Sequence, residues 1–233
     1  MKSTFSSICL FAAIVVAASL LLPDCREQKK EPVRTAFQEI SSKAEAGDAT
    51  FQFILAGKYS DGEGVDKNPT KAVEWYRKAA AQNHARAQSA LGSAYQIGRG
   101  VEKDYREAVR WFREAAAQNN LEAQCSLGGC YRFGHGVEPD YKEAVKWFRK
   151  AAERNYVVAQ WSLGNCYYQG DGVEKDYVEA YAWLNLAAWI SESVAKERDS
   201  LEIKMSRQQI EAGQKRTQEL KAEIEARRKS SDN

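Results

Sequence analysis

Apolar and polar positions along this chain follow a helical period, and the helical segments recur at a fixed step. Ala87, Leu91 and Tyr95 are spaced i, i+4, i+8, which places them on one face of a helix. The same three letters return 36 residues later and again after another 36, as Ala123-Leu127-Tyr131 and Ala159-Leu163-Tyr167. A second helical stretch follows each first one and carries a tryptophan, at Trp75, Trp111, Trp147 and Trp183. A repeat of this length predicts a stack of small units, each contacting only its neighbours.

The ends of these helices are marked by residues with known capping preferences. A Gly-x-Gly pair follows each first helix, beginning at Gly62, Gly98, Gly134 and Gly170. The first glycine of a pair is expected to end the helix with a positive φ. The second helix begins with an Asp-x-x-Glu capping box at Asp104, Asp140 and Asp176, and with Asn68-Pro69 in the first unit. Each unit is therefore predicted to be two helices joined by a short turn.

Glycine also recurs in the middle of the first helix, at Gly92, Gly128 and Gly164. A glycine there costs about 1 kcal/mol relative to alanine, so its recurrence indicates close approach of the second helix. The second helix carries a wide apolar arc that predicts burial against its partner and the next unit. We therefore expect Trp111 and its equivalents to be core residues, with a smaller contribution from Trp183 at the end of the array.

The combined pattern A-x-x-x-L-G-x-x-Y-x-x-G-x-G-V-x-x-D-x-x-x-A-V-x-W-[FY]-x-x-A-A resembles the Sel-one-like repeat family, a branch of the tetratricopeptide superfamily. It covers four units, 48–83, 84–119, 120–155 and 156–190, of which the second and third are identical at 20 of 36 positions. The first unit departs from it, with Phe51 and Ala56 where the other units have Ala and Gly. The resemblance implies an all-α, right-handed superhelix that acts as a non-enzymatic scaffold and binds another protein or peptide.

Both ends of the array carry additional segments. Residues 35–47 resemble the end of a preceding helix with Glu39 in place of the tryptophan, and we interpret them as an N-terminal capping half-repeat. Residues 191–233 are polar and highly charged, and they predict helices at about 192–204 and 207–228. We expect the first to cover the last repeat, because terminal repeats need a polar outer cover, and the second to project into solvent.

The N-terminal residues 1–22 indicate export, and residues 23–34 are interpreted as a linker. The apolar run from Ile8 to Leu22 follows Lys2 and is short for a spanning helix, so we interpret it as a signal peptide of a periplasmic or secreted protein. Two alternatives remain open: a lipoprotein acylated at Cys25, and an uncleaved N-terminal helix that anchors the chain. In each case the membrane is contacted only through this segment.

Composition and motifs point away from other function classes. The formal net charge of +2 gives no electrostatic footprint for nucleic acid. Each Gly-x-Gly follows a helix and lacks the rest of a phosphate-binding motif, so we interpret these glycines as turn residues. His84 and His135 occupy positions that hold different residue types in the other units, which argues against a catalytic role. The cysteines are interpreted as small buried thiols. We expect no catalytic site, cofactor or metal. A cell-envelope hydrolase or peptidoglycan-binding protein on the same scaffold is the alternative function.

Candidate partner-binding residues lie on the first helix, opposite the Ala-Leu-Tyr stripe, where the units differ from one another. The resemblance implies that this helix lines the concave groove. Trp161 and Tyr168 are the best candidate anchors, because aromatic residues dominate binding hot spots. Their alternative role is to pack against residues 192–204. The complete candidate set is Arg86, Ser89, Gln96, Glu122, Arg132, Trp161, Asn165 and Tyr168.

Overall fold

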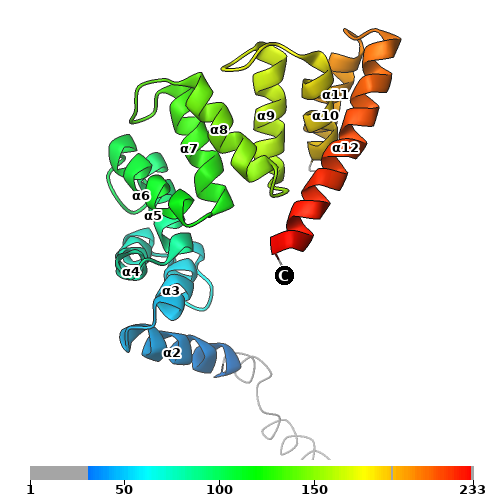
Figure 1. The fold of residues 1–233 in the computed structure, drawn as a ribbon. Helices are drawn as coiled ribbons and strands as arrows, with labels where there is room; N and C mark the ends of the chain where they lie inside the picture. The colour runs from blue at the N-terminus through cyan, green and yellow to red at the C-terminus, as the bar shows by residue number, and fades with distance from the viewer. Residues whose placement is uncertain (1–30, 190, 232–233) are drawn as a thin grey trace, which may run out of the picture.

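The computed structural model describes residues 31–189 and 191–231, and these residues form helices and no strands (Figure 1). The predicted signal peptide or anchor at 1–22 and the candidate lipid-attachment residue Cys25 lie outside the described residues. None of the helices in the two described ranges combines the length and the apolar character needed to cross a membrane.

Residues 49–187 form four consecutive helix pairs, in which we name the first helix of each pair helix A and the second helix B. The pairs are α3 (Ala49–Asp61) with α4 (Pro69–Ala81), α5 (Ala85–Ile97) with α6 (Tyr105–Ala117), α7 (Leu121–Phe133) with α8 (Tyr141–Ala152), and α9 (Val157–Gln169) with α10 (Tyr177–Ala187). α2 (Glu31–Glu45) precedes the array, and α11 (Glu192–Glu202) and α12 (Arg207–Ser231) follow it. The prediction of an all-α solenoid with four helix-turn-helix repeats is confirmed.

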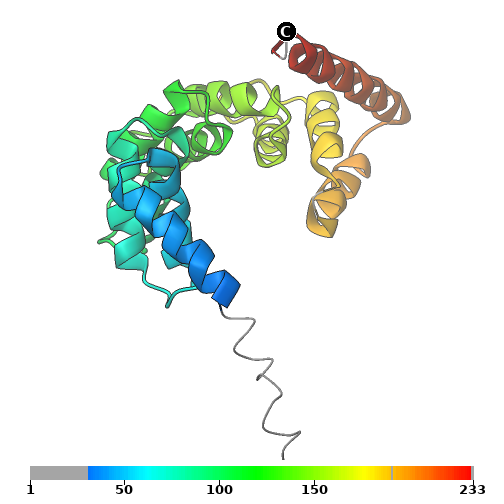
Figure 2. The same cartoon turned by 90° about the horizontal axis from the view of Figure 1, so that it is seen from below.

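The pairs stack into a curved solenoid, which Figure 2 shows as an arc. Helix A packs along helix B within each pair, and each helix B of the first three pairs packs against helix A of the next. The A helices α5 and α7 also approach each other directly, whereas no two B helices of the described chain come as close. Helices A therefore line the inner, concave side of the arc, and helices B form its convex side.

The predicted capping residues stand where the helices begin and end. One carboxylate oxygen of Asp104 accepts hydrogen bonds from the backbone N–H groups of Arg106 (2.8 Å) and Glu107 (3.1 Å), and Asp176 caps α10 in the same way. Gly98 ends α5 with φ 72°, a left-handed conformation that suits glycine. These capping contacts are local, and they coincide with the helix boundaries.

The mid-helix glycines do allow helices A and B to approach closely. A Cβ atom at Gly128 would lie 2.8 Å from the Phe148 ring, and one at Gly92 would lie 2.7 Å from the Phe112 ring. In the fourth pair Leu184 replaces the phenylalanine, and a Cβ at Gly164 would lie 2.9 Å from it. The glycines therefore leave room for a large side chain of helix B, as predicted.

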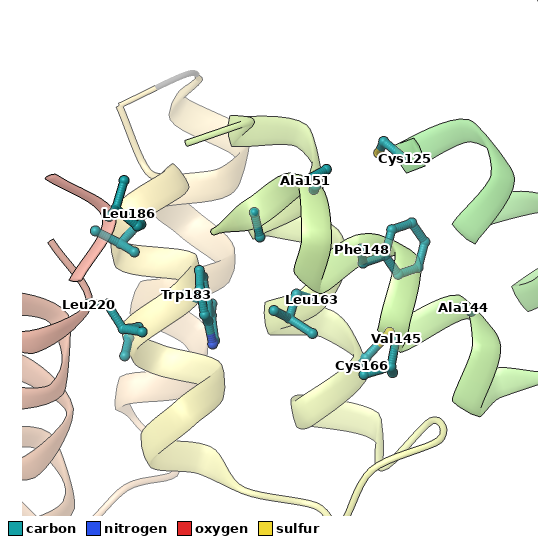
Figure 3. Close-up of a cluster of buried hydrophobic side chains, with 14 residues drawn as sticks. Cys125, Ala144, Val145, Phe148, Ala151, Leu163, Cys166, Trp183, Leu186 and Leu220 are labelled. Carbon is teal, nitrogen blue, oxygen red and sulfur yellow. The ribbon is translucent and has the colours of Figure 1, made fainter. Parts of the chain in front are cut away.

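The two C-terminal helices cover opposite sides of α10. Leu201 of α11 is buried with Leu184 of α10, beside aromatic side chains of α9. On the other side, Leu220 of α12 is buried with Trp183, which Figure 3 shows between Leu220 and Leu163. The prediction that the second C-terminal helix projects into solvent is wrong, because α12 lies along α10 and buries an apolar face there.

The repeated tryptophans are not equivalent, and the expected order of their burial is also wrong. Trp75, Trp111 and Trp147 are only half-buried on the convex side, whereas Trp183 is 4% exposed. In the middle repeats the fully buried aromatic side chain is the neighbouring phenylalanine, as at Phe112. The difference arises because α12 covers Trp183, while no corresponding helix of the described chain covers the three earlier indoles.

Candidate functional site

One stripe of side chains on each helix A faces the concave side. Its members follow the spacing i, i+4, i+7, i+11 and are mostly exposed or half-buried. The two middle positions hold small or short polar residues, and each stripe has an apolar residue at its first or last position. The stripes are Arg86, Ala90, Ser93 and Ile97 on α5, then Glu122, Ser126, Gly129 and Phe133 on α7, then Val158, Ser162, Asn165 and Gln169 on α9. Ser162 is the buried exception, at 7% exposure. The small residues form a shallow floor that a partner backbone could approach.

Three of the eight candidate residues, Arg86, Glu122 and Asn165, belong to this stripe, and each of the other five lies one residue before a stripe member. Arg86 and Glu122 are exposed near the starts of α5 and α7, and Gln96 is half-buried near the end of α5. Ser89 is fully buried, so it does not belong to the surface. It lies at the same repeat position as Cys125, which is also buried, one residue away from the exposed stripe. Trp161 stands at the same repeat position but is only half-buried, so this position is covered on α5 and α7 and partly accessible on α9.

Four candidate residues line a single hollow of about 520 Å³ at the C-terminal end of the concave face. Arg132 comes from α7, and Trp161, Asn165 and Tyr168 come from α9, so two neighbouring repeats contribute. The rest of the lining comes from Leu184 of α10 and from one face of α11, namely Ser193, Lys196, Glu197, Ser200 and Leu201. Helix α11 is thus a wall of the hollow and not a separate tail.

Both aromatic candidates are held by the C-terminal region. The indole Nε1 of Trp161 donates a 2.7 Å hydrogen bond to Oε2 of Glu197. Lys204, just after α11, donates a hydrogen bond from Nζ to the hydroxyl of Tyr168, and this bond lowers the pKa of the tyrosine. The two roles considered for this aromatic pair are therefore combined, because the side chains contact 192–204 and also line the hollow.

Both polar candidates of the hollow make intramolecular hydrogen bonds, and that of Arg132 crosses a repeat boundary. The Arg132 guanidinium donates from Nε (3.1 Å) and Nη2 (2.8 Å) to one carboxylate oxygen of Asp171, and both side chains are largely buried. The side-chain amide nitrogen of Asn165 donates to the backbone carbonyl of Trp161 at 3.2 Å. The hollow therefore offers two aromatic rings, an amide and charges of both signs on side chains held by intramolecular contacts.

A second, smaller hollow of about 190 Å³ lies further along the concave face, where α4 and α5 meet. Its lining includes Tyr76, Ile97, Arg99 and Glu122, of which only Glu122 was among the candidates. Tyr76 stands where the later repeats have the buried Phe112 and Phe148, and its partial burial raises the pKa of its hydroxyl. The sequence signal was the departure at Ala56, whose methyl group stands where the other repeats have glycine.

Histidines and cysteines do not assemble a reactive centre in the described ranges. No group of His, Cys, Asp and Glu side chains in residues 31–189 and 191–231 is arranged to hold a metal ion. Burial raises the pKa of the Cys125 thiol to about 12 and those of Cys130 and Cys166 to about 11, which keeps them protonated and confirms them as buried free thiols. The repeated aspartates serve as helix caps, so they lend no support to a hydrolase.

Both histidines lie in the segments between helices and are half-buried, and each makes a specific contact. His84 caps α5, because its Nδ1 accepts a 3.2 Å hydrogen bond from the backbone N–H of Ala87. Its ring also stacks on Phe53, with 5.1 Å between the ring centroids. His135 stacks on Tyr105 at 4.5 Å, which joins the turn of one repeat to helix B of the previous one. Different residue types at one repeat position can each make a specific contact.

The comparisons with known proteins agree with this architecture. A crystal structure of a Sel1 repeat protein from Oxalobacter formigenes is 38% identical, with a TM-score of 0.63, over 66% of this chain and 64% of that one. The structure of a protective antigen present in uropathogenic Escherichia coli strains, with an SLR fold, is 32% identical, with a TM-score of 0.54, over 82% of this chain. The chain thus spans somewhat less than two thirds of the first protein and 48% of the second. A search of the curated proteins finds no match.

The match to the family extends over the whole array. The model of the Sel1 repeat matches residues 49–84, 85–120, 121–156 and 157–188, which together make up more than half of the chain. Each matched segment contains one helix A and one helix B of the solenoid. The chain therefore belongs to the Sel1 repeat family, whose members are generally non-catalytic scaffolds for protein–protein interaction.

Proposed function

We propose that this protein is a non-enzymatic scaffold that binds a partner polypeptide along its concave face. The hollow between α9 and α11, defined above by Trp161 and its neighbours, is the main recognition site in this proposal. The observation that carries it is the convergence of Arg132, Trp161, Asn165 and Tyr168 on one hollow of about 520 Å³. These residues differ from their counterparts in the other repeats, so stacking of the repeats does not require them.

Preorganisation supports the choice of this hollow over the rest of the face. Glu197 holds the Trp161 indole, and Lys204 holds the Tyr168 phenol. A partner that packs against rings already fixed in position loses less side-chain entropy on binding than one that must order them. Aromatic side chains in partly desolvated pockets are also the residues that contribute most to binding in protein interfaces.

The lining indicates the kind of partner segment that would fit. The rings of Trp161 and Tyr168 and the side chains of Leu184 and Leu201 would contact an apolar or aromatic side chain. Lys196 is exposed and pairs with Glu192 at 2.7 Å, and its charge would be complementary to an acidic neighbour in the partner. Exposed Phe133 and Ile97 (64% each) continue the apolar character toward the second hollow, so an extended segment could contact both.

The binding proposal is tested with a peptide selected from a random display library against the intact protein. Trp161→Ala is expected to weaken binding of that peptide by about 2 kcal/mol or more, roughly 30-fold in the dissociation constant. Tyr141→Ala is the matched control, because Tyr141 is an exposed aromatic residue (48%) on α8 and does not line the hollow. Unchanged affinity in a folded Trp161→Ala variant would refute the choice of anchor.

A second variant keeps the test decisive if Trp161→Ala lowers stability. Asn165→Arg places a long side chain in the hollow and leaves both aromatic contacts with the C-terminal region in place. It should block the peptide while the far-UV circular dichroism spectrum and the melting temperature stay close to those of the wild type. Full binding by Asn165→Arg would contradict the proposed location.

We also propose that the protein is exported, on the basis of the apolar run from Ile8 to Leu22. Mass spectrometry of the mature protein separates the three forms of this proposal. A cleaved signal predicts a soluble protein that begins near Ser19. A lipoprotein predicts membrane-bound material that begins at an acylated Cys25 and is lost in Cys25→Ser, and an anchored protein predicts an intact N-terminus in the membrane fraction. An intact soluble cytoplasmic chain would refute export.

A further inference from the structure

Charge is segregated between the two sides of the solenoid. Helices α4, α6 and α8, the convex B helices of the first three repeats, carry ten Lys and Arg residues against four Glu residues, a net charge of +6. All ten basic side chains are exposed. The whole chain has a net charge of only +2, because the rest of the chain carries a net charge of −4 (+2 minus +6), to which three of the four turns between helix A and helix B contribute. The overall charge therefore hides a strongly basic convex band, which we define as the exposed face of these three helices.

Two of the four glutamates within this band are paired with basic neighbours. Glu107 pairs with Arg110 at 3.1 Å, and Glu143 pairs with Lys146 at 2.5 Å. Both glutamates are half-buried, whereas their basic partners are exposed. Glu74 and Glu114 remain exposed, but with ten basic and four acidic residues the net outward-facing charge of the band is positive.

The band is hollowed on both sides of Trp147, where it is most basic. A hollow of about 510 Å³ is lined by Lys142, Lys146, Lys150 and Arg149 of α8, together with Glu143 and Glu153. A second hollow of about 310 Å³ on the other side of the indole is lined by Lys150, Arg154 and Arg227 of α12. Arg227 is paired with Glu153, so the C-terminal end of α12 is joined to this part of the band.

The indole rings of the band are covered by cations. Lys150 Nζ lies 4.2 Å from the Trp147 ring centroid, and Lys78 Nζ lies 3.8 Å from that of Trp75. A membrane-binding surface needs apolar side chains that project into the lipid, and a single-stranded nucleic acid needs open ring faces for stacking bases. Rings covered by lysines can neither insert into lipid nor stack on bases, whereas exposed Lys and Arg side chains can form charge-assisted hydrogen bonds with carboxylates.

We propose that the convex band, centred on the two hollows beside Trp147, binds a carboxylate-rich polypeptide segment. This second interaction surface is separate from the concave groove. The two hollows beside Trp147 share no lining residue with the hollow between α9 and α11. The acidic segment would lie across α8, with its carboxylates paired to Lys142, Lys146 and Lys150. A scaffold with two such faces can hold two different segments at once.

The test uses fluorescently labelled poly-L-glutamate and the full chain at about 0.15 M ionic strength, where the Debye length is about 8 Å. Lys142→Glu, Lys146→Glu and Lys150→Glu combined should weaken binding at least about tenfold, because the contacts become repulsive. The matched control combines Lys43→Glu, Lys215→Glu and Lys221→Glu, three exposed lysines of α2 and α12 with the same change in net charge. The control should change the affinity less than about twofold, since exposed charges at a distance are screened.

Each other outcome overturns the proposal. Failure of the wild type to bind poly-L-glutamate would do so, as would equal weakening by the two triple variants, which would indicate only an effect of net charge. Band-dependent binding of anionic phospholipid vesicles or of a DNA oligonucleotide without binding of poly-L-glutamate would assign the band to that other class. If the Glu variant fails to fold, the same three lysines changed to Gln give the same comparison.

The concave proposal can fail separately. The peptide selected for the groove should bind the convex triple variant as it binds the wild type, and Asn165→Arg should leave poly-L-glutamate binding unchanged. Loss of both activities in either variant would show that the two faces are not independent.

Discussion

Trp111 and Trp183 occupy the same position in their repeats but have different environments. Trp111 is half-buried on the convex side, beneath the guanidinium of Arg110 at 4.5 Å from the ring centroid. Trp183 is buried beneath α12, and its Nε1 donates a 3.1 Å hydrogen bond to Glu179. An identical residue in a repeat therefore has no fixed structural role, because the helices that end an array bury positions that the middle repeats leave accessible to solvent.

The hydrogen bonding of the two indoles also differs, because only the Trp183 Nε1 has an acceptor among the described residues. Glu107 stands where Glu179 stands in the last repeat, but it pairs with Arg110. The Nε1 of Trp111 is buried and has no hydrogen-bond partner in the described part of the chain. Glu179 instead accepts from Trp183 and also from Arg216 of α12. The C-terminal cap thus satisfies a donor that stays unpaired in a middle repeat.

The largest difference is expected between Trp183→Ala and Trp111→Ala. Trp183→Ala should lower the free energy of unfolding by about 3–5 kcal/mol, as for other large-to-small changes in a core. Trp111→Ala should cost about 1–2 kcal/mol, because the indole is only partly buried. Urea denaturation of both variants, followed by circular dichroism, measures the two values.

Phe112→Ala is the control for this comparison, because Phe112 is fully buried in the same repeat as Trp111. It should cost about as much as Trp183→Ala, which would show that the second repeat is sensitive at the phenylalanine and not at the tryptophan. Equal costs for Trp111→Ala and Trp183→Ala would contradict the environments described above.

The next effect in size concerns the close approach of helices A and B. Gly128→Ala should lower the free energy of unfolding by about 1–3 kcal/mol, because the new methyl group must displace the Phe148 ring. Gly129→Ala is the matched control on the same helix, where a Cβ atom meets nothing within 4 Å. It should raise stability by up to about 1 kcal/mol through helix propensity. Melting temperatures that shift in the same direction would refute this account of the packing.

The link between α12 and α10 should have a smaller effect. Arg216→Ala removes the 2.6 Å contact with Glu179 and leaves that carboxylate largely buried with only the indole as a donor. We expect a cost of about 1–2 kcal/mol in the free energy of unfolding. Arg207→Ala, which removes a fully exposed i,i+4 pair with Glu211, should have almost no effect. A similar cost for the two variants would show that the cap does not depend on this network.

The smallest effect is a dependence of stability on pH in the second repeat. Burial, followed by the charge of Arg86, lowers the pKa of His84 below its ordinary value of 6.5. The unfolded chain therefore binds the proton more readily, so stability is full above about pH 6.5 and decreases as the pH falls through the folded-state pKa. We expect a loss of less than about 1 kcal/mol, since a helix cap contributes about that much.

His84→Asn is the control for this pH dependence. The equivalent residue of the third repeat, Asn120, accepts the hydrogen bond from the backbone N–H of Ala123 at 2.8 Å and does not titrate. The variant should keep the cap and lose part of the decrease in unfolding free energy between about pH 7.5 and about pH 5. An unchanged pH profile would show that His84 does not contribute to it.

Local signals predicted the repeats and helix ends well, because a capping box or a C-terminal glycine acts within one turn of the chain. Asp104 and Gly98 could be assigned their roles from neighbouring residues alone. Asn83 belongs to the same class but was missed: it ends the turn after α4 with φ 61°, a conformation that Asn tolerates better than most residues. The signal was its recurrence as Asn119 and Asn155.

Contacts between segments distant in sequence were predicted less well. Burial of Trp183 depends on α12, which begins more than twenty residues later, and the burial of Ser89 depends on the direction in which the neighbouring repeat packs. A helical period alone does not distinguish a stripe that faces the groove from one that faces the next repeat. The hollow was predicted in its α7 and α9 residues and the packing of 192–204 on Trp161 and Tyr168 was one of two alternatives, but that α11 and α9 together form one hollow followed only from the structure.

Hydrogen exchange of the intact protein, with and without a saturating amount of the selected peptide, tests the proposed binding face most directly. Because the hollow is formed by α9 and α11, we expect slower exchange in 157–169 and 192–202 on binding, with little change in α4, α6 and α8. Protection confined to those convex helices, with 157–169 and 192–202 unchanged, would contradict recognition on the concave face.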